Sequence, residues 1–396
     1  MASLTISETA SAIFAGACPT TATRRVLHVI NGEHYAGAER VQDLLAEHLK
    51  PLNIETHFVC VKHDTFEARR HWKDAPLTSI PVRSPWPRSA IRQLADRLRR
   101  EAFDLVHAHT PRSLWLAAPA ADRARLPLVY TLHDVSLNEP VSWLRRRLRN
   151  RTLRLLRRAD AVIAVSPAAL EVAESLELGV TRILVPNGVP RRERAKEYPG
   201  SPPVFGTVGL LRPRKGIETL VEAAGYLRAQ GADFRLRIVG PWENPEYARL
   251  IQREVARAGI EEYTEFPGFV SDVDRALGEF DWFVMPSVLA EGTPMVVLEA
   301  MAAGIPVIGS RVPGVVELIR SGVDGYLVPP GDARQLADQM ATACQIAAAK
   351  TRKWSDMSEQ AWRRQRALYS AEVMAERTAA CYQRLWENAP VSTRPH

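Results

Sequence analysis

Short apolar runs alternate with longer amphipathic stretches along most of this chain, and this rhythm limits the folds open to it. In the first half, apolar runs predict strands at residues 26–30, 55–61, 104–109, 128–133, 161–166 and 182–186. The second half repeats the rhythm, with strands predicted at residues 204–210, 235–240, 264–269, 282–286, 306–310 and 326–328. Helical patterns lie between them, for example at 38–49 and 144–157. This repetition predicts an α/β architecture in which helices cover both faces of parallel sheets.

Residues 191–203 are polar and rich in turn formers, and they divide the chain into two halves. A length of 396 residues fits two domains of ordinary size. We therefore expect two doubly wound, Rossmann-like domains, at 24–190 and 204–368, that face each other across a cleft. We expect residues 1–23 to form a loose tail. Residues 369–396 are expected to form a C-terminal helix, entered through a bend at Tyr369 and Ser370, that packs back on the N-terminal domain. Such sheets bind ligands beyond the carboxyl ends of their strands, so the cleft is the expected site.

Composition excludes several classes of protein. Hydrophobic residues make up 46% of the chain and charged residues 24%, which excludes a disordered chain and a coiled-coil rod. The four cysteines lie far apart, which argues against a disulfide scaffold or a cysteine zinc site and favours a reducing compartment. No apolar run is long enough to span a membrane, and residues 1–23 lack the charged start of a signal peptide. We expect a cytoplasmic protein.

Positive charge is concentrated in the N-terminal half, where residues 24–190 hold 26 Lys and Arg against 18 Asp and Glu. This surplus predicts an anionic partner. It is densest from Arg145 to Arg158, where leucines at 144, 148 and 155 share the face expected to pack on the sheet. The arginines form either a solvated helix face or a peripheral contact with anionic lipid at the inner face of the cell membrane. Nucleic acid is not an expected partner, because the stretch lacks interleaved aromatic residues.

A helix start after the predicted strand at 282–286 is the most informative local feature. Thr293 is a candidate N-cap, and Pro294 suits the first helical position. The amides of Met295 and Val296 would then be free at the positive end of the helix dipole. This arrangement predicts an anion site suited to a pyrophosphate.

Two glutamates flank this helix start. Glu291 lies in the loop before the helix, and Glu299 lies one turn inside it, on the same face as Met295. Gly292 has no side chain that could block a close ligand. A carboxylate beside a phosphate would repel it, so both glutamates should face hydroxyl groups, which a sugar nucleotide supplies. The alternative is a well-capped helix with two solvated glutamates.

These residues resemble the glutamate-x7-glutamate motif of glycosyltransferase family 4, also called group 1, whose members are retaining transferases of the GT-B fold. The matching stretch runs from Glu291 to Ile308. Gly314, Glu317 and residues 322–328 agree with the family's downstream motifs, and residues 186–189 match its interdomain turn. The resemblance covers nearly the whole chain.

The resemblance implies roles for both glutamates and for the amides between them. Glu291 would face the donor sugar, and Glu299 would bind the ribose of the nucleotide. The phosphates would be held between Gly292 and Val296, a segment that includes Thr293 and Met295.

The resemblance also implies a pair of cations and a pocket for the base. Lys215 matches the family's lysine and would neutralise the departing diphosphate. Leu210 stands where the family often has an arginine, and Arg212 is the expected substitute. The base would be read near Gly240 and Val270.

In the N-terminal half, the resemblance places His133 near the donor sugar and the reaction centre. Gly37 keeps the second of two adjacent family glycines, while Ala36 replaces the first. His107 and His109 share one face of a strand, but a metal pair needs further ligands and none is placed for it, so we expect both to be structural.

No metal or other cofactor is expected. Asp272 and Asp274 have the spacing of a metal-binding Asp-x-Asp. Their position at a predicted helix start favours a role in stabilising the helix dipole.

The resemblance implies transfer of a sugar from a UDP- or GDP-sugar to a glycan or lipid-linked acceptor, in the synthesis of a cell-surface polysaccharide or a glycolipid. Domain closure would bring His133 and Gly37 to the donor. The alternatives are a sugar-nucleotide isomerase (epimerase) on a similar scaffold and a non-catalytic nucleotide-sugar-binding protein of the same fold. The non-catalytic alternative stays open because Leu210 and Ala36 depart from the family's usual residues at these positions.

Overall fold

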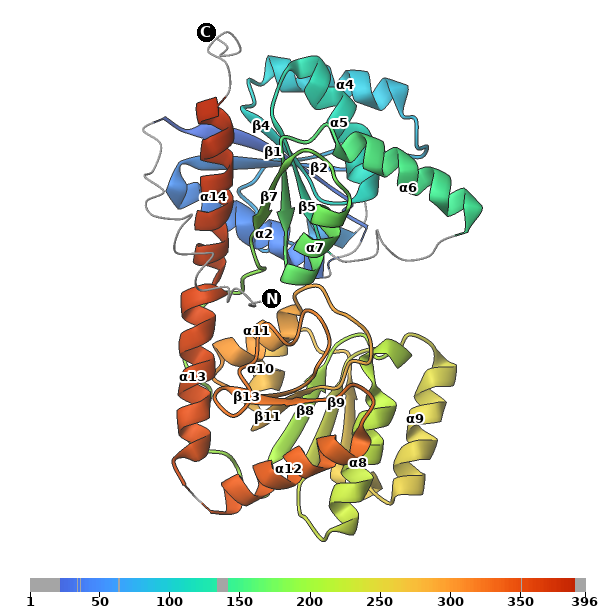
Figure 1. Cartoon of the computed structure of the whole chain (residues 1–396), viewed down its shortest axis with the longest axis vertical. Helices are drawn as coiled ribbons and strands as arrows, with labels where there is room; N and C mark the ends of the chain where they lie inside the picture. The colour runs from blue at the N-terminus through green and yellow to red at the C-terminus, as the bar shows by residue number, and fades with distance from the viewer. Residues whose placement is uncertain are drawn as a thin grey trace. The chain divides into compact units, whose positions relative to one another are not determined.

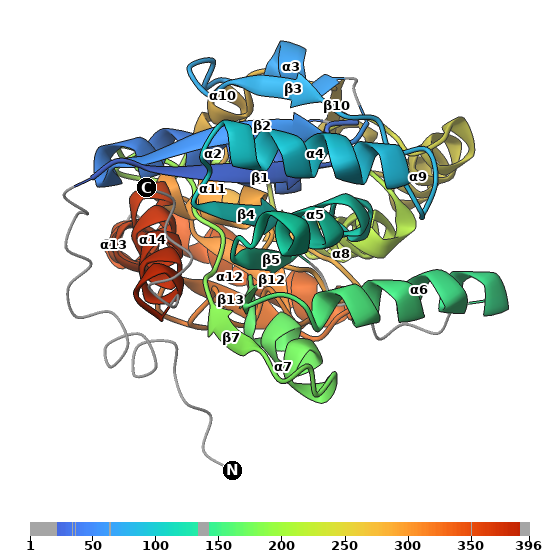
Figure 2. The ribbon, with the colours of Figure 1, turned by 90° about the horizontal axis from the view of Figure 1, so that it is seen from above.

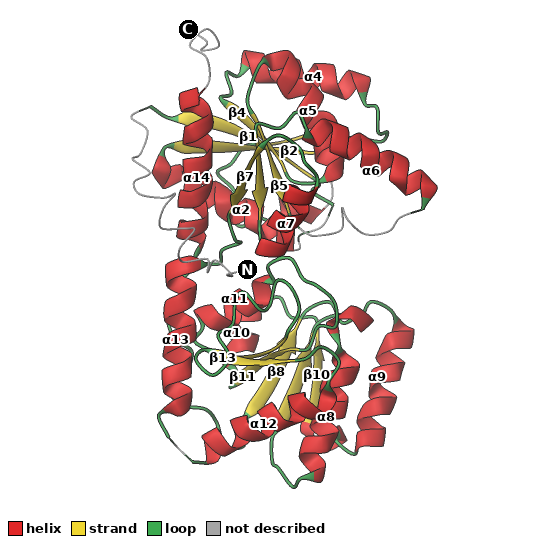
Figure 3. Ribbon diagram, viewed as in Figure 1, coloured by secondary structure: helices red, strands yellow, loops and turns green. Residues whose placement is uncertain are grey.

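The computed structural model describes residues 22–33, 35, 37–62, 65–133, 142–349 and 351–388. They form two compact units, in each of which helices flank a parallel sheet (Figures 1 and 3). Unit 1 comprises the described residues up to Asn187 together with those from Ala371 onward. Unit 2 comprises Gly188–Ser370.

The sheet of unit 1 has seven parallel strands in the order β3-β2-β1-β4-β5-β6-β7. The strands are β1 (Arg24–Ile30), β2 (Ile54–Cys60), β3 (Leu77–Ser79), β4 (Leu105–Ala108), β5 (Leu128–Leu132), β6 (Ala161–Ala164) and β7 (Thr181–Leu184). Every residue of β4, β5 and β6 is buried, which explains their nearly continuous apolar sequence. Apolar runs predicted each strand except β3, which lies at the sheet edge and contains no buried residue.

The connecting helices of unit 1 are α2 (Gly37–Leu49), α3 (Thr65–Arg69), α4 (Arg88–Arg100), α5 (Pro111–Ala124), α6 (Trp143–Leu156) and α7 (Pro167–Ser175). Helices α4, α5 and α6 pack in a row (Figure 2). The last helix that the structure describes, α14 (Ala371–Asn388), packs on α2 (Figure 1). The C-terminal segment therefore contributes side chains to the core of the N-terminal unit.

Helix α6 departs from its predicted packing. It packs mainly on α5. Leu155 is buried in the core, whereas Leu148 is only half-buried. The side chain at position 144 lies outside the described residues.

The sheet of unit 2 has six parallel strands in the order β10-β9-β8-β11-β12-β13. Its strands are β8 (Val204–Val208), β9 (Arg235–Val239), β10 (Thr264–Gly268), β11 (Trp282–Met285), β12 (Val307–Ser310) and β13 (Gly325–Val328). Its helices are α8 (Ile217–Ala229), α9 (Pro245–Ala258), α10 (Val273–Gly278), α11 (Met295–Ala302), α12 (Ala333–Ala348) and α13 (Lys353–Leu368). The strand order reverses between β8 and β11, and ligands bind at the carboxyl ends of strands where a doubly wound sheet reverses.

A break at Tyr369 and Ser370 separates α13 from α14. Among the described helices, none combines the length and the apolar character needed to cross a bilayer.

Candidate functional site

Two loops meet where the strand order of unit 2 reverses. The loop after β8 contains a 3-10 turn, Pro213–Lys215, and the second loop joins β11 to α11. Gly216 has a φ of 66°, and a Cβ added there would lie 2.0 Å from the Pro286 carbonyl oxygen. Only glycine permits this approach. The Val288 amide donates to the Arg214 carbonyl at 3.0 Å, which ties the loops together.

The Glu291 carboxylate receives contacts from both loops. Lys215 Nζ lies 2.9 Å from Glu291 Oε1, and the Ser287 hydroxyl donates to the same oxygen at 2.8 Å. The Arg214 guanidinium lies 3.9 Å from Oε2. The family motif implied separate roles for Glu291 and Lys215, and their ion pair was not predicted. Ser287 was not predicted either, because it has no local sequence signal beyond its place after β11.

Burial lowers the pKa of Lys215, while the carboxylate of Glu291 opposes that shift. The positive charges of Arg214 and Arg212 lower the pKa of Lys215 further. Arg212 is half-buried, and it forms no ion pair with any residue that the structure describes. Two cations therefore contact one carboxylate, and a third, Arg212, lies close enough to lower the pKa of Lys215. This excess positive charge favours an anionic ligand.

The start of α11 differs by one residue from the prediction. Pro294 is the N-cap, with extended backbone and no capping side chain, and the helix begins at Met295. The prediction that Thr293 caps the helix is therefore wrong. The amides of Val297 and Leu298 donate to the Pro294 carbonyl, so those of Met295 and Val296 precede the first helical hydrogen bonds.

Glu299 lies inside α11 and is fully buried. A buried carboxylate interacts more strongly with a polar partner than one in water does, because the local dielectric is low.

A third segment fixes the loop that carries Glu291. The Glu291 amide donates to the Pro313 carbonyl at 2.9 Å. Gly314 has a φ of 87°, and an added Cβ would lie 2.1 Å from the Gly292 carbonyl oxygen. The Gly314 amide donates to the Glu317 carboxylate at 2.7 Å. These contacts give a physical reason for Gly314 and Glu317, which the sequence offered only as motif matches.

The predicted base-reading residues lie beyond β9 and β10. Gly240 has a φ of 136°, and an added Cβ would lie 1.8 Å from the Gly209 carbonyl oxygen. Its amide donates to the Gly268 carbonyl at 2.8 Å. Val270 follows β10 and is half-buried, next to an exposed Phe269.

In unit 1, His133 follows β5 and is half-buried. Its Nε2 lies 3.3 Å from His109 Nδ1. Gly37 is exposed and begins α2, whereas Ala36 falls outside the described residues. The expectation that no further metal-ligand type lies near His107 and His109 is wrong, because a nitrogen of His28 lies within 4.8 Å of nitrogens of both.

The Asp-x-Asp pair has structural partners. Asp272 is the N-cap of α10 and accepts a hydrogen bond from the Arg275 amide at 2.9 Å. Asp274 forms an ion pair with Arg192 at 2.5 Å. Asp272 therefore stabilises the helix start, as its position predicted, whereas the ion pair of Asp274 with Arg192 was not predicted.

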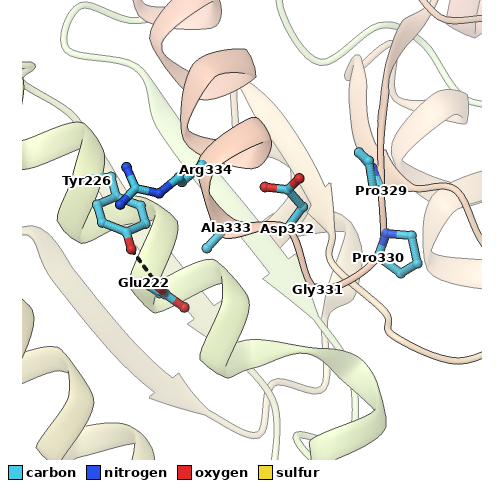
Figure 4. A pocket seen from close by; sticks show the side chains of 8 residues that line it. All are labelled: Glu222, Tyr226, Pro329, Pro330, Gly331, Asp332, Ala333 and Arg334. Carbon is cyan, nitrogen blue, oxygen red and sulfur yellow. Dashed lines mark hydrogen bonds between the residues drawn. The ribbon is translucent and has the colours of Figure 1, made fainter.

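A surface hollow between α8 and the start of α12 holds none of the predicted site residues (Figure 4). Tyr226 donates to Glu222 at 2.8 Å, and Arg334 lies over the Tyr226 ring. Asp332 caps α12 by accepting from the Gln335 amide. Local contacts use these polar groups, so we assign the hollow no function.

Two models of glycosyltransferase families match successive parts of the chain. Residues 35–193 match the model described as Glycosyltransferase Family 4, and residues 202–345 match the one described as Glycosyl transferases group 1. A putative colanic acid biosynthesis glycosyltransferase, WcaL of Salmonella typhimurium, is 34% identical over 205 residues, which are 48% of this chain and 49% of that protein. The phosphatidyl-myo-inositol mannosyltransferase of Mycobacterium leprae is 31% identical over 60% of this chain and 63% of that protein. The chain thus spans about half of the WcaL length.

Solved structures share the fold over nearly the whole chain. Anabaena Alr3699/HepE in complex with UDP and glucose superposes with a TM-score of 0.74 at 22% identity, covering 91% of this chain and all of that one. The lipopolysaccharide outer core galactosyltransferase WaaB superposes with a TM-score of 0.71 at 18% identity, covering 91% and 99%. The sheets therefore have the GT-B type of architecture, and with the two family matches they show that this chain belongs to the group 1, family 4 glycosyltransferases.

Proposed function

We propose that this protein is a retaining glycosyltransferase that moves a sugar from a nucleotide diphosphate sugar to a glycan or lipid-linked acceptor. The observation that carries the proposal is the contact of Lys215 and Arg214 with Glu291, with Arg212 near Lys215, at the reversal point of the unit 2 sheet. That location and that charge suit a ligand with both phosphate and hydroxyl groups.

In this proposal, Lys215 and Arg212 stabilise the leaving diphosphate. The anomeric carbon–oxygen bond to the diphosphate breaks, a bond to the acceptor oxygen forms, and the acceptor's proton passes to the diphosphate. Negative charge grows on the diphosphate during this step, and fixed cations in a partly buried site stabilise it. The amides of Met295 and Val296 add donors at the positive end of α11.

Glu291 and Glu299 then bind hydroxyl groups, at the donor sugar and at the ribose respectively. The backbone at Gly292 and Thr293 runs close to the phosphates. Gly240 and Val270 line the pocket that binds the base. His133 and Gly37 of unit 1 contribute positioning contacts to the donor. Because three cations and the helix amides already supply positive charge, the proposed reaction needs no metal ion.

A lipid-linked acceptor fits the surface of α6. Arg146, Arg147 and Arg154 are exposed on this helix. Arg151 lies over the ring of Trp86, which is 60% exposed. Arginines beside an exposed tryptophan suit the interface of an anionic membrane. The Mycobacterium leprae relative is named for a lipid acceptor, phosphatidyl-myo-inositol. We propose peripheral attachment at the cytoplasmic face of the cell membrane.

Calorimetric binding of UDP, GDP and ADP to the purified chain tests the proposed donor site. We expect one nucleotide to bind, and Glu299→Ala to weaken it roughly ten- to a hundredfold, because hydrogen bonds to a charged group contribute about 1.5–3 kcal/mol. Glu299→Gln keeps one acceptor oxygen and should lose less. Circular dichroism of both variants checks that the buried substitution has not unfolded unit 2.

The nucleotide that binds selects the sugar donors for a turnover assay. Transfer to an acceptor with retention at the anomeric carbon, followed by NMR, is the expected result. Binding without transfer to any glycan or lipid-linked acceptor would favour the non-catalytic alternative. Epimerisation of the donor without an acceptor would favour the isomerase, and failure of all three nucleotides to bind would overturn the donor site.

A further inference from the structure

A line of buried polar side chains crosses the core of unit 1. His28 of β1 and His107 of β4 are register partners, and both are fully buried. His109 follows β4 and is also buried. Tyr382 of α14 is buried against them, with its ring at 5.7 Å from that of His107. Burying so many polar groups is costly unless each finds a hydrogen-bond partner.

Every side chain in this line is hydrogen bonded to the next. Thr131 Oγ1 lies 2.7 Å from His107 Nε2, and His107 Nδ1 lies 2.6 Å from the Tyr382 hydroxyl. The same hydroxyl lies 3.3 Å from His28 Nε2. His28 Nδ1 lies 3.0 Å from His109 Nε2, and His109 Nδ1 lies 3.3 Å from His133 Nε2. We call this chain of six side chains the histidine relay.

The three inner imidazoles are neutral at physiological pH. Burial lowers the pKa of His28 to about 3, and it also lowers the pKa of His107 and His109, with the neighbouring histidines adding to the effect. A neutral imidazole has one nitrogen that donates and one that accepts. Each inner ring uses both nitrogens within the relay, and among the described residues the Tyr382 hydroxyl has no hydrogen-bond partner outside it, so its proton goes to one of its two imidazole neighbours. The direction of one hydrogen bond therefore fixes the direction of all the others.

Thr131 selects between the two directions. If the relay ran from His133 toward Thr131, the threonine would accept from His107 and its own proton would need another acceptor. Among the described residues, the Thr131 side chain has no other hydrogen-bond partner, and the residue is 5% exposed. Thr131 therefore donates to His107, which orders every following bond: His107 to Tyr382, Tyr382 to His28, His28 to His109, and His109 to His133.

We propose that the histidine relay is a positioning device that holds His133 as the tautomer protonated at Nδ1, with Nε2 accepting from His109. Tyr382, His28, His109, His107 and Thr131 act through one another and touch no substrate. The inference rests on the proposed function only in giving His133 a part in sugar transfer. It explains why a tyrosine from α14 completes a polar line in the N-terminal unit.

A metal ion is the competing interpretation of these imidazoles. The nitrogens of His28, His107 and His109 lie within 4.8 Å of one another. However, both nitrogens of each ring already have a partner in the relay. A structural zinc site has four ligands, and no cysteine or carboxylate joins this group among the described residues. The hydrogen-bonded interpretation accounts for every ring nitrogen, and the metal interpretation does not.

The test uses the full chain labelled with ¹⁵N at histidine. The His133 signals are assigned by their loss in His133→Gln. In the wild type, we expect Nδ1 of His133 to show the shift of a protonated nitrogen and Nε2 that of an unprotonated one. Tyr382→Phe breaks the relay at its centre, so both shifts should move toward averaged values. An unchanged His133 spectrum in Tyr382→Phe would overturn the proposal.

Three further variants guard against a merely structural effect. Thr131→Val removes the donor that sets the direction and should mix the His133 tautomers, whereas Thr131→Ser keeps the hydroxyl and should restore the single tautomer. Tyr247→Phe is the matched control, because this buried tyrosine of unit 2 donates to Glu218 at 2.7 Å outside the relay. Its His133 spectrum should equal that of the wild type.

Activity and metal content complete the test. If the tautomers mix evenly, only half of the molecules hold the required form, so kcat should fall by about twofold or more with little change in the donor KM. A wild type that shows the single tautomer but transfers no sugar would contradict the proposed function and leave the relay intact. Stoichiometric metal in the purified protein, with His28, His107 and His109 signals that shift on chelation, would overturn the relay.

Discussion

The environment of Glu291 depends on residues far from it in the sequence. Lys215 belongs to the loop after β8, 76 positions earlier, yet its ammonium contacts the Glu291 carboxylate. The pair is largely buried, with side chains 20% and 11% exposed. A lysine in such a place is stabilised as a cation mainly by its carboxylate partner, because burial disfavours the charge. A diphosphate would provide a second anionic partner for the same ammonium.

Replacing Lys215 tests this residue directly. Lys215→Ala should lower kcat for sugar transfer by about a hundredfold or more, the usual effect of removing one group that stabilises charge in a transition state. Initial rates of nucleotide release measure it. Lys50→Ala is a suitable control, since this exposed lysine forms an ion pair with Asp74 in unit 1. A Lys215→Ala enzyme that kept most of its kcat would exclude the proposed role.

Local signals in the sequence predicted part of the site. The helix start, its amides and both glutamates follow from spacing and from the family motif. Gly314 and Tyr382 act through contacts between distant segments, and no periodicity or capping rule encodes such contacts. Ser287 contacts Glu291 four positions along the same loop, where no regular element imposes a pattern. The N-cap error at Thr293 has a local cause, because Pro294 keeps extended backbone at a position where its ring would also suit a helix.

At the scale of elements, hydrophobic pattern predicted every strand that is largely buried in its sheet. It failed at β3, an edge strand of three residues, because so short a segment is below the length at which an apolar or alternating pattern can be recognised. It also misassigned the packing of α6, because a leucine stripe shows that a helix has an inner face but does not show whether a sheet or a helix covers that face.

The exposed arginines of α6 give a prediction at the same scale. Replacing Arg146, Arg147 and Arg154 with glutamine should weaken binding to vesicles that contain phosphatidylglycerol by about a hundredfold, at about 1 kcal/mol for each basic residue near the surface. Sedimentation with the vesicles measures the bound fraction. Neutral phosphatidylcholine vesicles should bind the wild type weakly.

A matched triple variant controls for the change in net charge. Arg249, Arg253 and Arg257 are exposed on α9 of unit 2, and their replacement with glutamine removes the same charge from another surface. This variant should bind vesicles as the wild type does. Equal losses in the two triple variants would show that net charge, and not the α6 surface, governs the interaction.

At the scale of the whole molecule, the two units differ in how their stability should respond to pH. Unit 2 contains no histidine, whereas unit 1 buries His28, His107 and His109 as neutral groups. The pKa of each lies below its unfolded value of about 6.5, so the unfolded chain binds more protons at mildly acidic pH. The stabilisation is fully present above that value, and it is lost as the pH falls below it.

Lowering the pH from 7.0 to 5.5 should therefore destabilise unit 1 by about 1.3 kcal/mol for each of these histidines, or about 4 kcal/mol for the three. His57, whose pKa burial also lowers, acts in the same direction. Hydrogen exchange of β1 and β4, corrected for the intrinsic effect of pH, measures the opening of unit 1. Strands β8 and β11 of unit 2 provide the internal control and should show no comparable loss.

His107→Gln should reduce the pH dependence in unit 1 by somewhat less than a third, because one of the three fully buried imidazoles is gone while His57 still contributes. This comparison concerns the change between two pH values, so it stays informative even if the substitution itself costs stability. Equal pH dependence in β1 and β8 would mean that the buried imidazoles are not neutral groups that set the acid stability of unit 1. A loss confined to unit 1 would show that the polar line needed to orient His133 also limits the pH range in which its own unit remains folded.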